Sequence, residues 1–273
     1  MRTKTSLPDH PVSPDDITPP SDSHVQSLAR GLAVIRSFHA GARTQTISEV
    51  SAATGLTRAG ARRILLTLQG LGYVEIAGRD FGLTAKVLDL GFAYLTSMPL
   101  WDLAEPVLED FVGAMQESCS AAVLDGTDIV YVLRVPTHKI ITINLAVGSR
   151  LPAYCTSMGR VLLAALKPDA LAHTLAHSTL HKNNPATITD VDELHARIDT
   201  VRQQGWALVD QELEAGLISL AVPILGRNGQ TIAAINVSGN RNRTGPEEMV
   251  NRFLPRLTQA AREIGMRLQR IKT

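Results

Sequence analysis

Three arginines lie within two helical turns of Thr57, an arrangement suited to binding DNA. Arg58 and Arg62 are four residues apart, which places them on one face of a helix, and Arg63 flanks that face. A guanidinium can form two hydrogen bonds with a guanine base in the major groove, or it can bind a phosphate. An ordinary charged surface would also contain such residues, and the elements predicted around them decide in favour of DNA.

Thr156, Ser157 and Gly159 form a second group, which is suited to binding an anion. They precede an apolar helix predicted to begin near Ser157. A helix start presents free amide groups and the positive end of the helix dipole. The two hydroxyls and the glycine would suit the carboxylate of a small metabolite, with Tyr154 as a wall of the cavity. Helix capping alone would also account for these residues, and the pattern leaves both interpretations open.

Arg134 lies within an apolar run, where a cation needs a partner. That partner is either a ligand carboxylate or a structural carboxylate from Asp210 or Glu212, and the pattern favours the structural pair. Asn236 and Ser238 alternate with apolar residues in the last predicted strand, so their side chains share one face. That face lines a pocket or meets solvent.

Enzymatic chemistry has little support in the sequence. It contains no phosphate-binding loop, no dinucleotide-binding glycine motif and no zinc-ligand spacing. Cys155 lies beside a helix start, where the pKa of a thiol can be lowered, but no histidine is spaced to pair with it. We therefore expect no enzyme activity, no cofactor and no bound metal. Two alternatives remain open: a redox sensor that uses Cys155, and an enzyme of small-acid metabolism with an appended DNA-binding module.

The elements around the three arginines are those of a winged helix-turn-helix. Thr46 opens a capping box at the start of one helix, Gly55 ends that helix, and Thr57 caps the next one. Two helices joined by a short turn containing glycine have the helix-turn-helix spacing. Alternating residues around a turn then predict a hairpin over 73–83. We assign this DNA-binding domain to residues 24–83.

Two further helices of this half carry apolar faces. The helix predicted from residue 25 places Val25, Leu28, Leu32, Ile35 and Phe38 or His39 on one face, and Gly41 ends it. A connecting helix is predicted over 84–99. Its apolar face, with those of Leu103, Leu108 and Phe111, would be free to hold a dimer.

The second half, residues 100–273, has the pattern of an α+β domain. Two strands joined at Asp125 and Gly126 form a predicted hairpin, and a third strand is predicted over 140–147. Helices follow over 157–166, 169–177 and 190–204. Strands resume over 206–210, 218–225 and 230–238, and a long helix over 246–271, kinked at Pro255, closes the chain. Antiparallel strands with helices around them give this fold class.

The composition fits a folded intracellular protein. Of the 273 residues, 44% are hydrophobic and 19% are charged, which excludes wholesale disorder. Two cysteines cannot form a disulfide framework, and we expect reduced thiols, a cytoplasmic location and no membrane span. Residues 1–23 are rich in Pro, Asp and Ser and predict a disordered tail. Residues 24–97 contain twice as many basic as acidic side chains, which agrees with a nucleic-acid partner.

At the level of motifs the chain resembles the IclR family of transcriptional regulators. In the first half the resemblance rests on SLARGLAVI (27–35), ISEV (47–50), RIL (63–65) and LGYV (71–74). In the second half it rests on GSRLP (148–152), TSMGRVLLA (156–164), DQE (210–212) and AVPI (221–224). Within the family, Arg134 and residues 150–160 are similar to the branch that controls protocatechuate and 4-hydroxybenzoate catabolism through the β-ketoadipate pathway.

This resemblance implies a winged helix-turn-helix, a connecting helix and a GAF-like effector-binding domain. It also implies a homo-dimer or tetramer that binds double-stranded operator DNA and responds to a small carboxylate effector. The expected DNA contacts are Ser48, Thr57, Arg58, Arg62, Arg63 and Arg79. The expected effector contacts are Arg134, Tyr154, Thr156, Ser157, Met158, Asp210, Leu217, Ser219, Asn236 and Ser238. The alanines and glycine at 59–61 stand where relatives often carry Ser or Thr, so base contact falls more heavily on Arg58 and Arg62.

Overall fold

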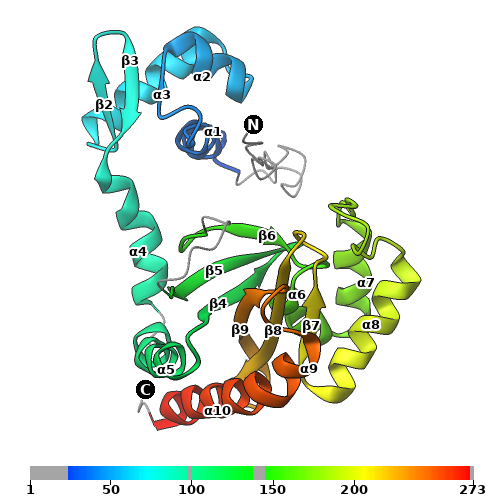
Figure 1. The fold of residues 1–273 in the computed structure, drawn as a ribbon. Coiled ribbons are helices and arrows are strands. Elements are labelled where there is room, and N and C mark those ends of the chain that lie inside the picture. The colour runs from blue at the N-terminus through cyan, green and yellow to red at the C-terminus, as the bar shows by residue number, and fades with distance from the viewer. Residues whose placement is uncertain (1–23, 98–99, 138–144, 271–273) are drawn as a thin grey trace. The chain divides into compact units, whose positions relative to one another are not determined.

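The computed structural model describes residues 24–97, 100–137 and 145–270, and the chain divides into two compact units between Leu90 and Gly91 (Figure 1). The expected tail, residues 1–23, lies outside the described residues. The elements of the first unit are α1 (Gln26–Arg36), β1 (Thr44–Gln45), α2 (Ile47–Thr54), α3 (Arg58–Gly70), β2 (Val74–Ala77) and β3 (Asp80–Leu83).

The helix-turn-helix of α2 and α3 forms where the caps predict it. The Thr46 hydroxyl accepts the amide of Glu49 at 3.3 Å, and the Glu49 carboxylate accepts the amide of Thr46 at 2.7 Å. The amide and the hydroxyl of Thr46 both donate to the Glu49 carboxylate, which lowers the pKa of Glu49. Gly55 ends α2 with φ 68°, and Thr57 caps α3 by accepting the amide of Gly60 at 3.1 Å. Local hydrogen bonding therefore fixes both helix starts.

Helix α1 buries one apolar face and exposes another. Val34 is fully buried against α3 and the wing, whereas Val25, Leu28 and Leu32 are 61%, 63% and 45% exposed. Val34 lies nine residues after Val25, which is half a turn away on a helix. The predicted helix is confirmed, and α1 presents the apolar stripe of Val25, Leu28 and Leu32 outward, whereas Ile35 packs against the core.

The wing is a three-stranded antiparallel sheet in the order β1-β3-β2. Gly78 turns between β2 and β3 with φ 66°, and Phe81 and Val74 pack onto the core of α3. The pairing of β1 with β3 was not predicted, because two residues carry no periodic signal. After the wing, a 3-10 turn (Ala85–Val87) leads into α4 (Leu88–Thr96).

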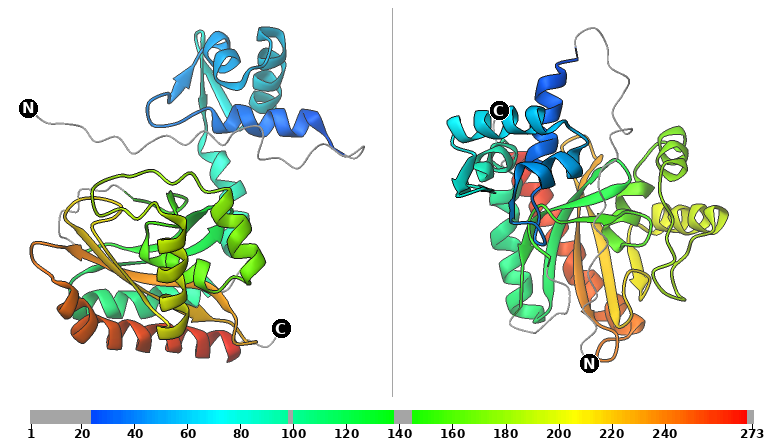
Figure 2. Two further views of the ribbon diagram at one scale, coloured as in Figure 1. Left: turned by 90° about the vertical axis from the view of Figure 1, so that its right-hand side faces the viewer. Right: turned by 90° about the horizontal axis from the view of Figure 1, so that it is seen from above.

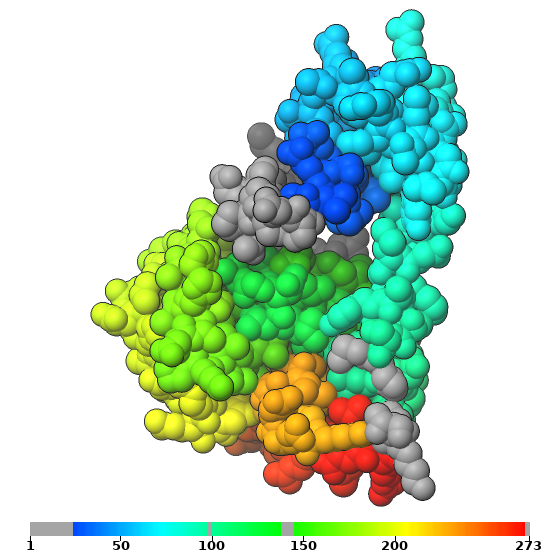
Figure 3. Space-filling view, turned by 180° about the vertical axis from the view of Figure 1, so that it is seen from behind, coloured from blue at the N-terminus to red at the C-terminus, as the bar shows by residue number. Residues whose placement is uncertain are grey.

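The second unit is a helix-covered antiparallel sheet. Its strands are β4 (Ser118–Asp125), β5 (Asp128–Val135), β6 (Arg150–Pro152), β7 (Ala207–Asp210), β8 (Leu217–Leu225) and β9 (Thr231–Asn240). Its helices are α5 (Leu100–Met115), α6 (Ser157–Ala164), α7 (Pro168–Ala176), α8 (Val191–Gln204), α9 (Pro246–Glu248) and α10 (Leu254–Arg270). The six strands follow the order β6-β5-β4-β9-β8-β7, and α7 and α8 lie at one side of this unit, on the left in Figure 3.

Different helices cover the two faces of this sheet (Figures 1 and 2). On one face α5 and α10 cover residues such as Cys119 and Ile235, and on the other α6 covers residues such as Ala122 and Ala234. Leu108 and Phe111 of α5 are buried in the first of these cores. They are therefore not free to hold a dimer, which corrects that part of the expectation, whereas Leu88, Phe92 and Tyr94 of α4 are exposed as the sequence predicts.

Two segments of this unit differ from their predicted form. Most of the expected strand 140–147 lies outside the described residues, and its last three residues form no strand, whereas β6 pairs with β5 just beyond it. The closing helix is not simply kinked at Pro255. A π-helical turn, Met249–Phe253, precedes α10 and widens the helix directly before the proline, which lacks an amide to donate.

Among the described residues, no helix is both long and apolar enough to cross a membrane.

Candidate ligand cavity and nucleic-acid interface

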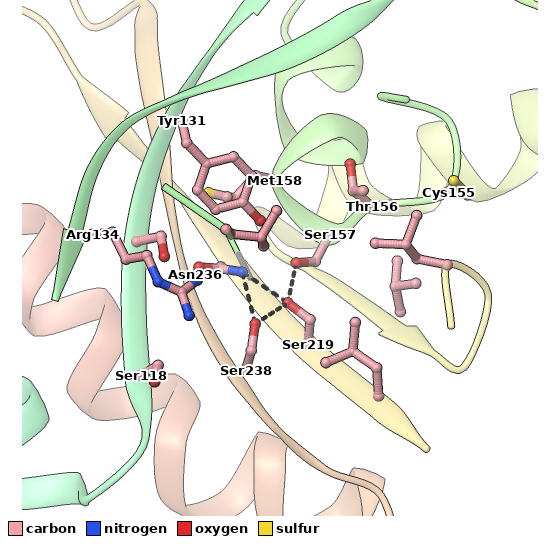
Figure 4. A pocket seen from close by; sticks show the side chains of 15 residues that line it. Ser118, Tyr131, Arg134, Cys155, Thr156, Ser157, Met158, Ser219, Asn236 and Ser238 are labelled. Atoms are coloured by element: carbon pink, nitrogen blue, oxygen red, sulfur yellow. Dashed lines mark hydrogen bonds between the residues drawn. The ribbon is translucent and has the colours of Figure 1, made fainter. Parts of the chain in front are cut away.

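A cavity lies between the sheet and the first turn of α6, in the second unit (Figure 4). The centres of water molecules can occupy about 40 Å³ of this cavity, which is enough space for more than one water. It is lined by Ser118, Ser120, Tyr131, Arg134, Leu145, Cys155, Thr156, Ser157, Met158, Val209, Leu213, Leu217, Ser219, Asn236 and Ser238. Eight of the ten expected effector contacts are in this set.

The register of three strands gathers small polar side chains on the cavity face. Ser238 of β9 lies between Ser118 of β4 and Ser219 of β8, and Asn236 lies opposite Ser120. Directly opposed residues of antiparallel strands share a face and are close neighbours. Ser118 and Ser120 were not predicted. Their alternation with buried residues in β4 is the signal that could have identified them.

These side chains form one hydrogen-bonded network (Figure 4). The hydroxyls of Ser157 and Ser219 are 2.6 Å apart, and the Asn236 amide nitrogen donates to Ser219 and Ser238, at 3.0 Å each. The Ser238 hydroxyl donates to Ser219 at 3.3 Å. The Asn236 side-chain oxygen is buried and has no hydrogen-bond partner among the residues that the structure describes. A buried polar atom without a partner is costly, so this oxygen is a group that a bound ligand would satisfy.

The first turn of α6 borders the same cavity through Thr156, Ser157 and Met158. The Thr156 hydroxyl accepts the amide of Gly159 at 3.2 Å, and the Arg160 amide bonds the Thr156 carbonyl. The amides of Ser157 and Met158 precede the first bond of the helix and have no partner within it. Gly159 is required here, because a Cβ atom would overlap the carbonyl oxygen of Ala153.

Arg134 brings a positive charge to the cavity. A bulge between Ala121 and Ala122 leaves Val132 of β5 unpaired, so that Tyr131 and Arg134 reach the same side of the sheet. Burial raises the pKa of Tyr131 to about 12, although the charge of Arg134 acts to lower it. The Tyr131 hydroxyl therefore stays protonated. Figure 4 shows the guanidinium of Arg134 directed toward Asn236 and the serines.

The structural ion pair that the sequence favours for Arg134 does not form. Asp210 pairs with Arg241 at 2.8 Å, and Glu212 pairs with Arg160 at 2.6 Å. Within the ranges that the structure describes, no carboxylate pairs with Arg134. Both carboxylates are held by nearer arginines, which leaves the half-buried guanidinium of Arg134 facing the cavity.

Two expected effector contacts lie outside the lining. The Tyr154 hydroxyl donates to the carbonyl of His181 at 2.6 Å, and its ring packs with Leu194 behind the cavity. Asp210 ends β7, where it binds Arg241. The structure therefore does not bring Tyr154 or Asp210 to the cavity.

Cys155 lines the cavity, but its thiol is poorly suited to redox chemistry. The residue is fully buried, and that burial raises the pKa of the thiol to about 12. The thiolate is the reactive form, so a raised pKa makes the sulfur less reactive at neutral pH. The other cysteine, Cys119, is also buried, and its thiol pKa is raised for the same reason.

The first unit displays the expected DNA contacts on its surface. Arg58, Arg62 and Arg63 are exposed on α3, whereas Ala61 and Leu65 of the same helix are fully buried. Ser48, Thr57 and Arg79 are also exposed, at the starts of α2 and α3 and at the tip of the wing. The helix thus keeps its cationic face free while its apolar face holds the domain together.

Metal-binding groups are absent from the described part of the chain, where no cluster of three His, Cys, Asp or Glu side chains could hold an ion.

Comparison with known proteins assigns the chain to a protein family. Residues 27–76 match the IclR helix-turn-helix domain, and residues 92–266 match the bacterial transcriptional regulator IclR C-terminal domain. The chain belongs to the IclR family. The Pca regulon regulatory protein of Pseudomonas putida is 47% identical to this IclR-family chain over 239 residues, which cover 87% of the chain and 82% of that protein. The fold expected from the sequence is confirmed, and the chain is an IclR-type transcriptional regulator related to regulators of aromatic-acid metabolism.

Solved structures agree with the family. A crystal structure from Rhodococcus sp. RHA1 is 49% identical and superposes with a TM-score of 0.81, covering 90% of this chain and 98% of that one. The inducer-binding domain of the PobR transcription factor from Acinetobacter, a double mutant in complex with 3-hydroxybenzoic acid, is 33% identical with a TM-score of 0.57. That match covers 60% of this chain and 96% of the PobR chain.

Proposed function

We propose that this regulator binds a hydroxylated aromatic acid, or the dicarboxylate formed by opening its ring, in the cavity at the start of α6. The observation that carries the proposal is Arg134, a half-buried cation in the cavity with no carboxylate partner among the described side chains. A ligand carboxylate would supply that partner. The amides of Ser157 and Met158 supply a second set of donors to the same anion.

The polarity of the cavity favours a hydroxylated acid over a plain one. The unpartnered side-chain oxygen of Asn236 can accept a hydrogen bond but cannot donate one. A phenolic hydroxyl is a donor that would satisfy it. Two relatives support this class of effector. One is the Pca regulon regulatory protein, and the other is the PobR inducer-binding domain in complex with 3-hydroxybenzoic acid.

We further infer that the protein acts as a homodimer on a palindromic operator in the cytoplasm. The outward apolar stripe of α1 is a surface that a second copy would bury, and a two-fold dimer matches a two-fold DNA site. In this scheme Ser48, Thr57, Arg58, Arg62, Arg63 and Arg79 contact DNA. Effector binding changes the affinity for the operator through coupling between the domains, without a catalytic step. A coupling free energy of about 1–3 kcal/mol suffices for a 5–150-fold change in operator affinity.

A thermal-shift screen of the full chain tests the effector class. The compounds are protocatechuate, 4-hydroxybenzoate, β-ketoadipate and cis,cis-muconate, with pyruvate and glyoxylate as small-acid controls. A ligand at about 100 times its Kd adds about 2.7 kcal/mol of stability, a shift of several degrees. Shifts with the aromatic or ring-opened acids alone support the proposal. Shifts with the small-acid controls alone, or with none of the compounds, contradict it.

A further inference from the structure

A buried ion pair stands directly behind the cavity wall. Arg160 Nη2 and Glu212 Oε2 are 2.6 Å apart, and their side chains are only 4% and 8% exposed. Arg160 Nε also donates to the carbonyl oxygen of Tyr154 at 3.0 Å. Neither residue lines the cavity, but Met158 and Leu213, close to them in sequence, do. The pair therefore joins two stretches of chain that both contribute to the lining.

Glu212 also holds a third stretch, which connects α7 to α8. Its carboxylate accepts the amide of Ile188 at 3.3 Å. Its backbone carbonyl accepts the hydroxyl of Thr187 at 2.6 Å and the side-chain amide of Asn184 at 3.1 Å. One residue thus fastens the α7–α8 connection against the turn that starts α6.

The energetics of this pair indicate a role other than stability alone. Removing two charges from water is expensive, and well-packed apolar side chains of similar size often stabilise a fold at least as well. Apolar side chains do not supply directional hydrogen bonds. The bonds of Arg160 and Glu212 fix where the backbone of residues 154–158 and 212–213 lies, and groups that contact a ligand need such support to hold their geometry.

We propose that Arg160 and Glu212 are positioning residues for the effector cavity. They hold the start of α6 against the β7–β8 connection at the spacing at which Ser157 reaches Ser219 and Leu213 closes the wall. Only the ligand-binding part of this inference rests on the proposed function, since the placement of the two walls can be tested without ligand.

Hydrogen exchange of the full chain without ligand tests that placement. Glu212→Gln keeps the size of the side chain and removes its charge. Glu248→Gln, which removes the charge of the exposed partner of Arg252, is the matched control. We expect Glu212→Gln to speed exchange together in 153–158, 184–188 and 212–217, with α10 unchanged and no effect in the control. Faster exchange confined to 184–188, or spread over the whole domain, would overturn the proposal.

Ligand affinity separates positioning from stability. The double variant Arg160→Met, Glu212→Leu leaves no unpaired buried charge and is expected to fold; it replaces Glu212→Gln in the exchange comparison if that variant unfolds. We expect it to bind 4-hydroxybenzoate and protocatechuate about tenfold or more weakly, the loss typical of charge-assisted hydrogen bonds, with operator affinity retained. Arg160→Lys, which keeps the ionic contact, should recover part of the affinity. Unchanged affinity in the double variant contradicts the proposal. If the natural chain binds neither acid, the effector class fails while the exchange result still decides the positioning role.

Discussion

The hydroxyl groups of Ser157 and Ser219 lie 2.6 Å apart and join the first turn of α6 to β8 across 62 positions of sequence. Ser219 accepts hydrogen bonds from Asn236 and from Ser238, which fills both of its lone pairs. Its own proton therefore goes to Ser157, and the proton of Ser157 is free to be donated into the cavity. The network thus offers one donor, at Ser157, and one acceptor, the oxygen of Asn236, at separate points of the cavity.

This polarity predicts how the cavity distinguishes hydroxylated from plain acids. We expect 4-hydroxybenzoate to bind about tenfold more tightly than benzoate, because its phenol satisfies the buried oxygen of Asn236. In Asn236→Ala the acceptor is gone, and the two acids should bind with similar affinity. Calorimetry of both ligands with the natural chain and with Asn236→Ala gives the four dissociation constants that this comparison needs. A preference for 4-hydroxybenzoate that persists in Asn236→Ala would show that the phenol binds elsewhere.

The exposed arginines of α3 predict a separation of DNA binding from effector binding. Arg58→Ala and Arg62→Ala should each weaken binding to an operator duplex by about 1–3 kcal/mol and relax its base preference. Fluorescence anisotropy on a duplex obtained by in vitro selection measures this. Thermal shifts with effector should be unchanged, and Arg197→Ala, an exposed arginine of α8, serves as the matched control. Loss of both activities in the α3 variants would indicate misfolding instead of lost contacts.

The outward apolar stripe of α1 predicts a dimer that depends on it. Leu28→Lys with Leu32→Lys should leave the first unit folded, because both side chains are exposed and the buried Val34 is untouched. The charges oppose burial against a second copy, so sedimentation should show dissociation to monomers. Operator affinity should fall in parallel, since a monomer contacts one half-site. A variant that remains dimeric would place the interface on another surface.

Burial of the cysteines predicts a regulator that is insensitive to mild oxidants. The pKa of Cys155 is raised from 9.0 to about 12, so the folded state favours the neutral thiol. This contribution to stability is fully present below pH 9 and is lost as the pH rises through 12. Iodoacetamide at pH 8 should modify the thiols far more slowly in the native protein than after denaturation. Operator binding should respond to hydrogen peroxide equally little in the natural chain and in Cys155→Ser, and a response abolished by that substitution would favour the redox sensor.

Features set by neighbouring residues could be predicted from the sequence. The capping box of Thr46 and Glu49, the caps at Thr57 and Thr156, and the turn at Gly126 each depend on a few consecutive residues. The structure has all of them at the expected positions. The order of such local signals was enough to predict the winged helix-turn-helix and most of the strands of the second unit.

Features that depend on tertiary pairing could not be predicted in this way. Simple alternation places Arg134 on the same face as Val132, and only the bulge near Ala122 turns it toward the cavity. The apolar residues of α1 have helical spacing in the sequence, yet spacing does not say which apolar face meets the partner helix. Arg160 and Glu212 are 52 positions apart, and their pairing follows from packing that no local pattern encodes.

We infer that Arg134 binds the carboxylate of a hydroxylated aromatic acid in the cavity, and a titration of the natural chain and an Arg134 variant tests this contact. Protocatechuate and 4-hydroxybenzoate are titrated by calorimetry into the natural chain and into Arg134→Met, which keeps the length of the side chain and removes its charge. Arg197→Met is the control for loss of a surface charge. We predict one site per chain in the natural protein and the control, and affinity at least about tenfold lower in Arg134→Met, because a charge-assisted hydrogen bond is lost. Equal affinity in Arg134→Met, or no binding of either acid to the natural chain, would contradict the account.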